Sequence, residues 1–265
     1  MSREAMAEVA RLYYVRELTQ QQIAQRLGVS RFKVLRLLEQ ARAEGVVRFE
    51  IDEPVPVLDE LSRRLEERYG VTAVVVERDI ARAAAGLLPR LLTGDDVLGV
   101  AWGETLAAIA EQLPSVDSGV PVVQICGAID GLVAGTGPTE LAARFAGKTG
   151  GRFHPLEAPA VADERALRRA VRPTTAIFDE VSLALVGIGA RADAAGHMLV
   201  HVFDDEGRIV SAERSIALSV AQLRRTRVVA VAGGRPKQRA VLGALRTKLV
   251  DVLVTDAGCA RFALA

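Results

Sequence analysis

TQQQIAQRLGVSRFKV, residues 19–34, is the stretch that determines the predicted fold of the N-terminal part of this chain. Ala24 is a small residue at the point where two steeply crossing helices approach each other. Gly28, four residues later, suits a turn that requires positive φ. Val34 follows six residues after the glycine and supplies the apolar anchor of a second helix. The remaining members of this small predicted core are Ile23, Leu27, Val29, Leu37 and Leu38. The spacing therefore predicts a helix-turn-helix.

Hydrogen-bonding residues stand where the two helices are expected to begin. Thr19 is placed to cap the first helix, with Gln22 at the capping-box position, and Ser30 is placed to cap the second. In a helix-turn-helix the second helix enters the major groove with its N-terminal turns leading. The predicted DNA-binding residues are Thr19, Gln20, Ser30, Arg31, Lys33 and Arg36.

The positive charge of the chain is concentrated near its N-terminus. The whole chain has a net charge of only +1, but residues 1–50 contain nine basic and six acidic residues. Arg31 and Arg36 are expected to bind guanine edges or phosphates, and Lys33 to bind a phosphate. An ordinary helical hairpin with a solvated basic face is the alternative. The alternating pattern of Val46–Ile51, a candidate wing strand, favours the DNA-binding interpretation.

Composition excludes several other classes of protein. Of the 265 residues, 50% are hydrophobic and 25% are charged, which is typical of a chain that buries a sizeable core. There is no apolar run of the roughly 18 residues that a membrane span needs, and no signal-peptide pattern, so a soluble cytoplasmic protein is expected. Two cysteines cannot form a disulfide framework. His197 and His201 lack partners with metal-site spacing, and 204–207 suits a hairpin turn better than a calcium loop, so no metal is expected.

Beyond Gly70 the pattern alternates between strands and helices, which predicts a mostly parallel sheet covered on both faces. The predicted strands are Thr72–Glu77, Asp96–Ala101, Val120–Ile125, Ser182–Ile188, Arg227–Ala232 and Asp251–Thr255, and helices are expected at 104–113, 138–147, 163–171 and 236–249. The fold class is therefore α/β: a small N-terminal winged helix-turn-helix domain at 1–52, a linker helix within 53–70, and a larger doubly wound α/β effector-binding domain at 71–265.

Four predicted strands end in glycine-containing turns, at the edge where open α/β sheets bind their ligands. The turns contain Gly103 and Thr105, Gly187 and Gly189, Gly233 with Gly234 and Lys237, and Asp256 with Gly258. The first, third and fourth turns lead into predicted helices, whose free N–H groups suit an anion, whereas the stretch after the second turn soon meets glycine and is a poor helix. Trp102 lies beside the first turn and fits either a pocket wall or the core. The second turn and Ala192 spell GxGxxA, but no acidic residue ends a second strand about 20 residues later, so no nicotinamide cofactor is expected. Together the four turns predict a small-molecule pocket.

Several motifs, in their order along the chain, resemble those of the SorC/DeoR-type sugar-responsive transcriptional regulators. The motifs are ARLYY, LTQQQIAQRLGVSRFKVLRLLEQARAEGVV, GVAWGETLAAIA, VVQICGAI, APAVAD, LALVGIG, FDDEGRIV and VAGGRPKQRAVLGALRTKLVDVLVTD, and they span nearly the whole chain. The resemblance implies a winged helix-turn-helix, and an effector domain similar to glucosamine-6-phosphate deaminase and ribose-5-phosphate isomerase that senses a phosphorylated sugar. It also implies a homotetramer or dimer.

The resemblance also assigns residues to the effector site. Gly103, Glu104, Thr105 and Leu106 occupy the positions of the family's phosphate loop, and Gln124, Asp204, Lys237 and Asp256 occupy positions around the sugar. With Gly187 and Gly189 these are the predicted effector-binding residues. Glu104 departs from the pattern, because a carboxylate serves a phosphate less well than a hydroxyl would.

The sequence thus predicts a regulator of carbohydrate-metabolism genes that binds double-stranded operator DNA and a small sugar or sugar phosphate, without a cofactor and without catalysis. The alternative is a sugar-phosphate isomerase or deaminase with an appended nucleic-acid module. Such an enzyme needs an acid/base pair, for which only Asp204, Lys237 and Asp256 are candidates. A third interpretation is a DNA-binding oligomer whose α/β domain binds nothing.

Overall fold

The computed structural model describes residues 2–47, 55–129, 131–160, 175–212 and 216–265. The chain divides into two compact units, Met1–Glu53 and Pro54–Ala265. Each unit has a hydrophobic core of its own, and the two cores share no residue.

The N-terminal unit is helical. Its elements are α1 (Arg3–Ala10), a π-helical turn (Arg11–Val15), α2 (Gln20–Leu27) and α3 (Arg31–Ala43). The helix-turn-helix predicted from the sequence is confirmed: Ala24 and Val34 are buried, and Gly28 ends α2 with a φ of 62°. The fully formed core consists of Met6, Val9, Ala10, Ile23, Ala24, Val34, Leu37, Leu38 and Ala41. Of the predicted wing strand, residues 46 and 47 follow α3 without strand structure, and the rest lies outside the described residues.

The larger unit is built on a sheet with the strand order β1-β10-β9-β5-β2-β3-β4. Every neighbouring pair along this path is parallel. The strands are β1 (Thr72–Val76), β2 (Leu98–Val100), β3 (Val122–Gln124), β4 (Phe153–His154), β5 (Leu183–Ala190), β9 (Arg227–Ala232) and β10 (Val252–Asp256). All six predicted strands are confirmed, and their buried valines and leucines form the centre of the core.

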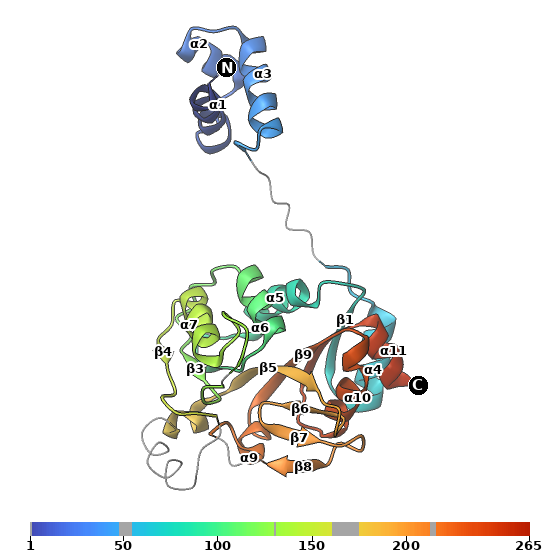
Figure 1. Ribbon diagram of the computed structural model, residues 1–265. Helices are drawn as coiled ribbons and strands as arrows, with labels where there is room; N and C mark the ends of the chain where they lie inside the picture. Colours follow the sequence, from blue (N-terminus) through green and yellow to red (C-terminus); the bar gives the residue numbers. More distant parts are fainter. Residues whose placement is uncertain (1, 48–54, 130, 161–174, 213–215) are drawn as a thin grey trace. The chain divides into compact units, whose positions relative to one another are not determined.

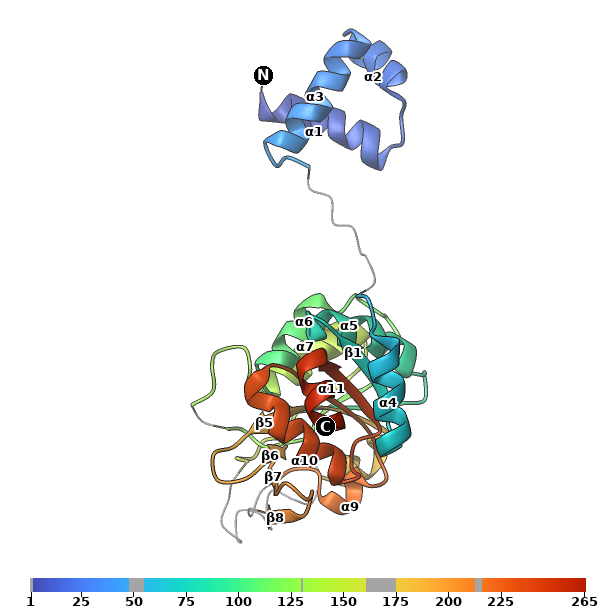
Figure 2. The ribbon, with the colours of Figure 1, turned by 90° about the vertical axis from the view of Figure 1, so that its right-hand side faces the viewer.

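Helices cover the sheet in two groups, as a doubly wound fold requires (Figures 1 and 2). One group contains α5 (Ile80–Leu91), α6 (Glu104–Gln112) and α7 (Pro138–Thr149), and the other α4 (Asp59–Tyr69), α10 (Gln238–Arg246) and α11 (Ala257–Leu264). A short helix, α9 (Val220–Leu223), precedes β9. Helix α5 is not among the predicted helices, and the predicted helix at 163–171 lies outside the described residues.

The predicted linker helix corresponds to α4, which packs within the larger unit. Leu65 is fully buried there, and the Ser62 hydroxyl accepts a hydrogen bond from the Val75 amide at 3.1 Å. At the other end of the helix the Tyr69 hydroxyl donates to the carbonyl of Ala263 at 2.6 Å. Helix α4 is therefore part of the wall of the α/β unit rather than a free connection.

An antiparallel arm extends from the end of β5. It consists of β6 (Gly196–Met198), β7 (His201–Phe203) and β8 (Ile209–Ala212), paired in sequence order. His197 lies in β6 and His201 in β7, and 204–207 forms the predicted hairpin turn, in which Gly207 has a φ of 79°. The arm packs on α10, so the turn lies against the helix that follows Lys237.

Candidate functional site

The strand order of the sheet reverses between β2 and β5. From β2 the chain adds β3 and β4 on one side, whereas from β5 it adds β9 and β10 on the other. The loops at the carboxyl ends of these two neighbours therefore diverge and leave a crevice, which is the usual ligand site of open α/β sheets. A cavity of about 360 Å³ lies there. Its lining includes Trp102, Gly103, Glu104, Thr105, Leu106, Leu132, Val133, Thr136, Gly187, Gly189, His197, Leu199, Gly233 and Lys237.

The first wall of this cavity is the turn between β2 and α6. Gly103 precedes the helix with a φ of 123°, a conformation that favours glycine, and no side chain caps the helix. The first N–H groups of α6 are thus left for a ligand, and the helix dipole makes this end partly positive. Thr105 is half-buried, while Leu106 is fully buried and anchors the turn. Glu104 is exposed and adds a negative charge at the rim.

The second wall comes from β5. The sequence predicts a glycine turn at Gly187 and Gly189, but this prediction is wrong, because β5 continues to Ala190. Both glycines lie in the strand and allow other groups to approach it. A Cβ at Gly187 would lie 3.6 Å from Leu106, and one at Gly189 would overlap the ring of His197. The glycines therefore provide room beside the strand rather than a phosphate-binding loop.

The third wall is the turn after β9. Lys237 is half-buried in a short 3-10 helix, Arg235–Lys237, that leads into α10, as the sequence predicts. Asp256 holds this turn from the neighbouring strand: its carboxylate accepts hydrogen bonds from the amides of Gly234 and, at 2.8 Å, Cys259. Asp256 does not line the main cavity. It lines an adjoining groove, together with Glu77, Arg78, Asp79, Glu104 and other residues.

Besides Asp256, two further predicted effector-binding residues, Gln124 and Asp204, lie outside the cavity. Gln124 is fully buried, and its amide donates to the carbonyl of Cys126 at 2.8 Å and accepts from the amide of Leu156 at 3.1 Å. Its hydrogen-bonding groups are thus used inside the core. The geometry therefore does not bring Gln124 to a ligand in this cavity.

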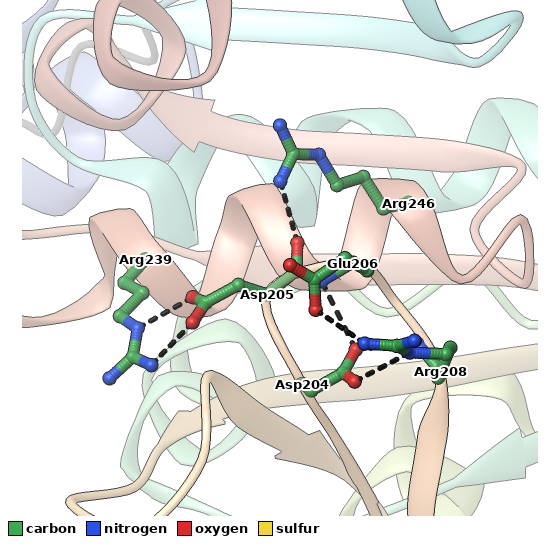
Figure 3. A network of polar contacts seen from close by, with 6 residues as sticks. All are labelled: Asp204, Asp205, Glu206, Arg208, Arg239 and Arg246. Carbon is green, nitrogen blue, oxygen red and sulfur yellow. Dashed lines mark hydrogen bonds and ion pairs between the residues drawn. The ribbon is translucent and has the colours of Figure 1, made fainter.

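Asp204 lies in the β7–β8 turn (Figure 3). Its carboxylate accepts from Arg208 Nε at 2.9 Å and from the Arg208 amide at 2.8 Å. Partial burial acts to raise the pKa of Asp204, but these hydrogen bonds and the charge of Arg208 hold it below its usual range. The carboxylate closes its own turn, so it is not positioned to contact a sugar in the cavity.

Part of the cavity lining is not among the residues predicted from the sequence. Leu132, Val133 and Thr136 come from the loop between β3 and α7, where the Thr136 hydroxyl donates to the carbonyl of Val133 at 2.7 Å. The signal was present, because this loop is glycine-rich and follows the carboxyl end of a predicted strand. Trp102 does line the cavity. It also lines a second cavity of about 310 Å³, which shares His197 and Leu199 with the first.

The cavity does not bring together the three acid/base candidates that the sequence offers. Of Asp204, Lys237 and Asp256, only Lys237 lines it. Both cysteines are buried, and burial raises the pKa of Cys126 and of Cys259 to about 12, with the charge of Asp256 contributing for Cys259. They are therefore neutral core residues. Among the described residues, no group of three or more histidine, cysteine or acidic side chains could hold a metal ion.

The N-terminal unit presents a basic helix surface. Ser30 caps α3 by accepting from the Lys33 amide at 3.2 Å, and Thr19 and Gln22 form the predicted capping box of α2. Arg31 donates to the side chain of Gln20 at 3.5 Å and so bridges the two helices. The basic residues of α3's first turns, Arg31, Lys33 and Arg36, are all exposed. The start of α3 thus lies beside the start of α2 through Arg31 and Gln20, and Lys33 and Arg36 are accessible on α3.

No helix within the described residues is both long and apolar enough to cross a membrane.

Comparison with known proteins finds a matching family model for each of the two units. Residues 54–193 and 190–265 match the Sugar-bind family model of a sugar-binding domain, and residues 3–44 match the model of sigma-70 region 4. The deoxyribonucleoside regulator of Bacillus subtilis is 32% identical over 96% of this chain and 95% of its own length. The erythritol catabolism regulatory protein EryD of Brucella abortus is 29% identical, over 92% and 91%.

A solved structure agrees with these relatives. The full-length sorbitol operon regulator SorC from Klebsiella pneumoniae matches with a TM-score of 0.72 and 26% identity, covering 99% of each chain. These relatives are regulators of transcription, so the isomerase or deaminase alternative has no support from them. The matched domains and the identity over nearly the full length assign this chain to the SorC/DeoR-type family of sugar-binding transcriptional regulators.

Proposed function

We propose that the chain binds operator DNA through α3 and changes its DNA affinity when a small carbohydrate, in phosphorylated form, occupies the cavity between β2 and β5. The observation that carries this proposal is the uncapped N-terminus of α6, which opens with Lys237 into one cavity of about 360 Å³. That volume lies within the range of small-ligand sites. The site of action would be the cytoplasm.

The chemistry of the cavity supports an anionic group on the ligand. The backbone N–H groups at the start of α6 and the ammonium of Lys237 both favour a negative charge. Thr105 supplies a hydroxyl beside them. Glu104 opposes an anion, but its exposed carboxylate is screened by solvent. The apolar surfaces of Trp102, Val133 and Leu199 suit the faces of a sugar ring.

Binding is tested with matched pairs of sugars and their phosphates, using the melting temperature of the full chain and titration calorimetry. A ligand at 100 times its Kd stabilises the unit that binds it by about 2.7 kcal/mol. Lys237→Met should weaken the binding of a phosphorylated ligand by about 1.5–3 kcal/mol, because a charge-assisted hydrogen bond is lost. Lys248→Met removes an exposed lysine outside the cavity and should change nothing. If no compound of the panel shifts the melting temperature, the sensing role is refuted.

Coupling between ligand and DNA requires the two binding events to prefer different states of the protein. A tenfold change in operator affinity needs a coupling free energy of about 1.4 kcal/mol. We propose a dimer or tetramer as the responding assembly. Two recognition helices spaced about 34 Å apart would contact successive turns of the duplex, so the operator should be an imperfect palindrome.

The DNA surface is tested by electrophoretic shift at fixed salt concentration. Arg36→Ala should lose about 1–3 kcal/mol of discrimination between its preferred base pair and the others. Arg31→Ala should also weaken binding, because Arg31 lies at the start of α3 beside Gln20. Arg42→Ala, an exposed arginine in the last turn of the same helix, is the control and should have a smaller effect. Unchanged affinity and preference in both test variants would overturn the assignment of α3.

A further inference from the structure

The most exposed large apolar side chain described in the N-terminal unit is Phe32, which is 84% exposed. Phe32 is the second residue of α3, directly after the residue that begins the helix. Burial in the core falls on Val34, Leu37, Leu38 and Ala41. At about 100° per residue, Phe32 lies about 200° from Val34 and so points away from the core.

Phe32 shares this outward face with Arg36. The two residues are four apart, so their side chains are neighbours on the helix surface. Arg31 lies closer to α2, where its guanidinium donates to Gln20 at 3.5 Å. In the first turns of α3 the outward face therefore presents one phenyl ring and one guanidinium, rather than the arginine pair expected from the sequence, and the exposed Glu39 follows on the same face further along the helix.

The surroundings of Phe32 indicate what kind of partner covers it. A single exposed apolar residue is ordinary on a protein surface and by itself implies no partner. This one, however, is flanked by the exposed cations Arg31, Lys33 and Arg36, so the partner that approaches it is an anionic surface. Duplex DNA is such a surface, and its major groove offers an apolar group at one place only, the 5-methyl group of thymine.

We propose that Phe32 is a specificity-determining residue that packs against a thymine methyl group in the operator. The step of four residues from Phe32 to Arg36 rises about 6 Å along α3, so the thymine lies within about two base pairs of the base that Arg36 contacts. The Ser30 cap fixes the first turn of the helix and therefore the position of the ring. This inference rests on the proposed DNA-binding function and adds to it the base that is recognised.

The experiment begins with selection of binding sites by the full chain from a random duplex library at fixed salt. In the selected duplex each thymine is then replaced in turn by deoxyuridine, which removes the methyl group and leaves the base pair intact. At one thymine of each half-site the wild-type chain should bind the deoxyuridine duplex about fourfold more weakly, the effect of losing one buried methyl group.

The variants decide whether Phe32 is responsible for that effect. Phe32→Ala should bind the two duplexes equally, whereas Phe32→Leu should keep part of the difference. Phe262→Ala removes a partly exposed phenylalanine from α11 and should behave like the wild type. Circular dichroism of each variant checks that the helical unit is folded.

The outcomes separate this inference from the function on which it rests. If selection enriches no sequence, DNA recognition itself fails and the inference fails with it. If a sequence is enriched but no thymine responds to loss of its methyl group, or Phe32→Ala responds as the wild type does, the role of Phe32 is refuted and DNA binding remains.

Discussion

His201 shows how one buried side chain makes stability depend on pH. His201 is 5% exposed, and its Nε2–H donates to the carbonyl of Leu218 at 2.7 Å. Nδ1 has no hydrogen-bond partner among the described residues. Burial lowers the pKa of His201, and the hydrogen bond to Leu218 offsets this only in part. The neutral ring is therefore the form that the fold accommodates.

We predict that the larger unit loses stability as the pH falls from 7.5 to 5.5. The unfolded chain binds a proton at His201 near its ordinary pKa of about 6.5, while the folded chain binds it only at lower pH. The contribution of His201 to the free energy of unfolding is thus present above about pH 6.5 and is lost below it. The free energy of unfolding should change by at most about 1.4 kcal/mol per pH unit through this residue. His201→Gln keeps a donor but does not titrate, so denaturant unfolding at several pH values should show a smaller slope.

His154 provides the comparison. Burial also lowers the pKa of His154, and nearby Arg152 adds to the effect, but this ring is less buried than that of His201. His154→Gln should reduce the slope less. An unchanged slope in His201→Gln would mean that the imidazole of His201 is not the source.

At the residue level the sequence predicts local roles well and distant ones poorly. The caps at Thr19 and Ser30 depend on partners three residues away, and both are found as predicted. Gln124 depends on Leu156, which is far away in sequence, and its place in the core could not be predicted from the residues around it. The same reason explains Asp256, whose partner Gly234 belongs to another strand-to-helix turn.

Among the elements, the contact between the β7–β8 turn and α10 is unusually close. Asp205 accepts two hydrogen bonds from Arg239, and the hydrogen bond from Arg239 is the main reason why the pKa of Asp205 is lowered (Figure 3). The carbonyl of Asp205 accepts from Arg246 at 2.7 Å. Gly207, in the same turn, has a φ of 79° and lies against the end of the helix. The turn is thus fixed to the helix that begins beside Lys237.

We predict that Gly207→Ala destabilises the larger unit by about 2–4 kcal/mol, because the added Cβ would overlap the backbone of Arg246 and Thr247 and positive φ is unfavourable for alanine. Gly86→Ala is the matched control. Gly86 lies within α5 with no atom near its Cβ position, so alanine should stabilise the helix by up to about 1 kcal/mol. Urea unfolding measures both. Equal effects of the two substitutions would contradict the close contact of the turn.

Elements with a strong local pattern are the ones that the sequence predicts. Strand β9 occupies the predicted residues, because its apolar run ends at a glycine pair. Helix α5 was missed, because Gly86 and Pro89 within Ile80–Leu91 weaken its helical pattern. The end of β5 was misassigned, because a glycine in a strand has the same appearance in sequence as a glycine in a turn. Only the antiparallel pairing of β5 with β6 shows that the strand continues.

For the whole molecule, the two separate cores predict two unfolding transitions in calorimetry. The helical core and the α/β core share no residue, so neither depends on the other for its packing. A carbohydrate that binds in the cavity should raise the transition temperature of the larger unit only. At 100 times its Kd it should increase the free energy of unfolding of that unit by about 2.7 kcal/mol. A single transition that moves as a whole on ligand addition would contradict this independence.

The overall architecture was predictable as a class but not in its strand order. Alternation of strands and helices indicates a parallel sheet, and glycine turns indicate the edge where a ligand binds. The reversal between β2 and β5 brings together segments that lie about 85 residues apart, and it depends on which strands pair, which no local pattern encodes. Leu199, which lies between β6 and β7, could therefore not be assigned to the cavity in advance, whereas Leu132 and Val133 lie in a glycine-rich loop after a predicted strand.

That reversal has a consequence for the response to a ligand. A molecule seated there touches backbone that leads into β3 and β4 on one side and into β9 and β10 on the other. Strands β2 and β5 could separate from each other only after the bound molecule had left the cavity. A bound effector should therefore make separation of the two halves of the sheet less frequent. The effect would be measured as slower hydrogen–deuterium exchange at the backbone amides of β2 and β5.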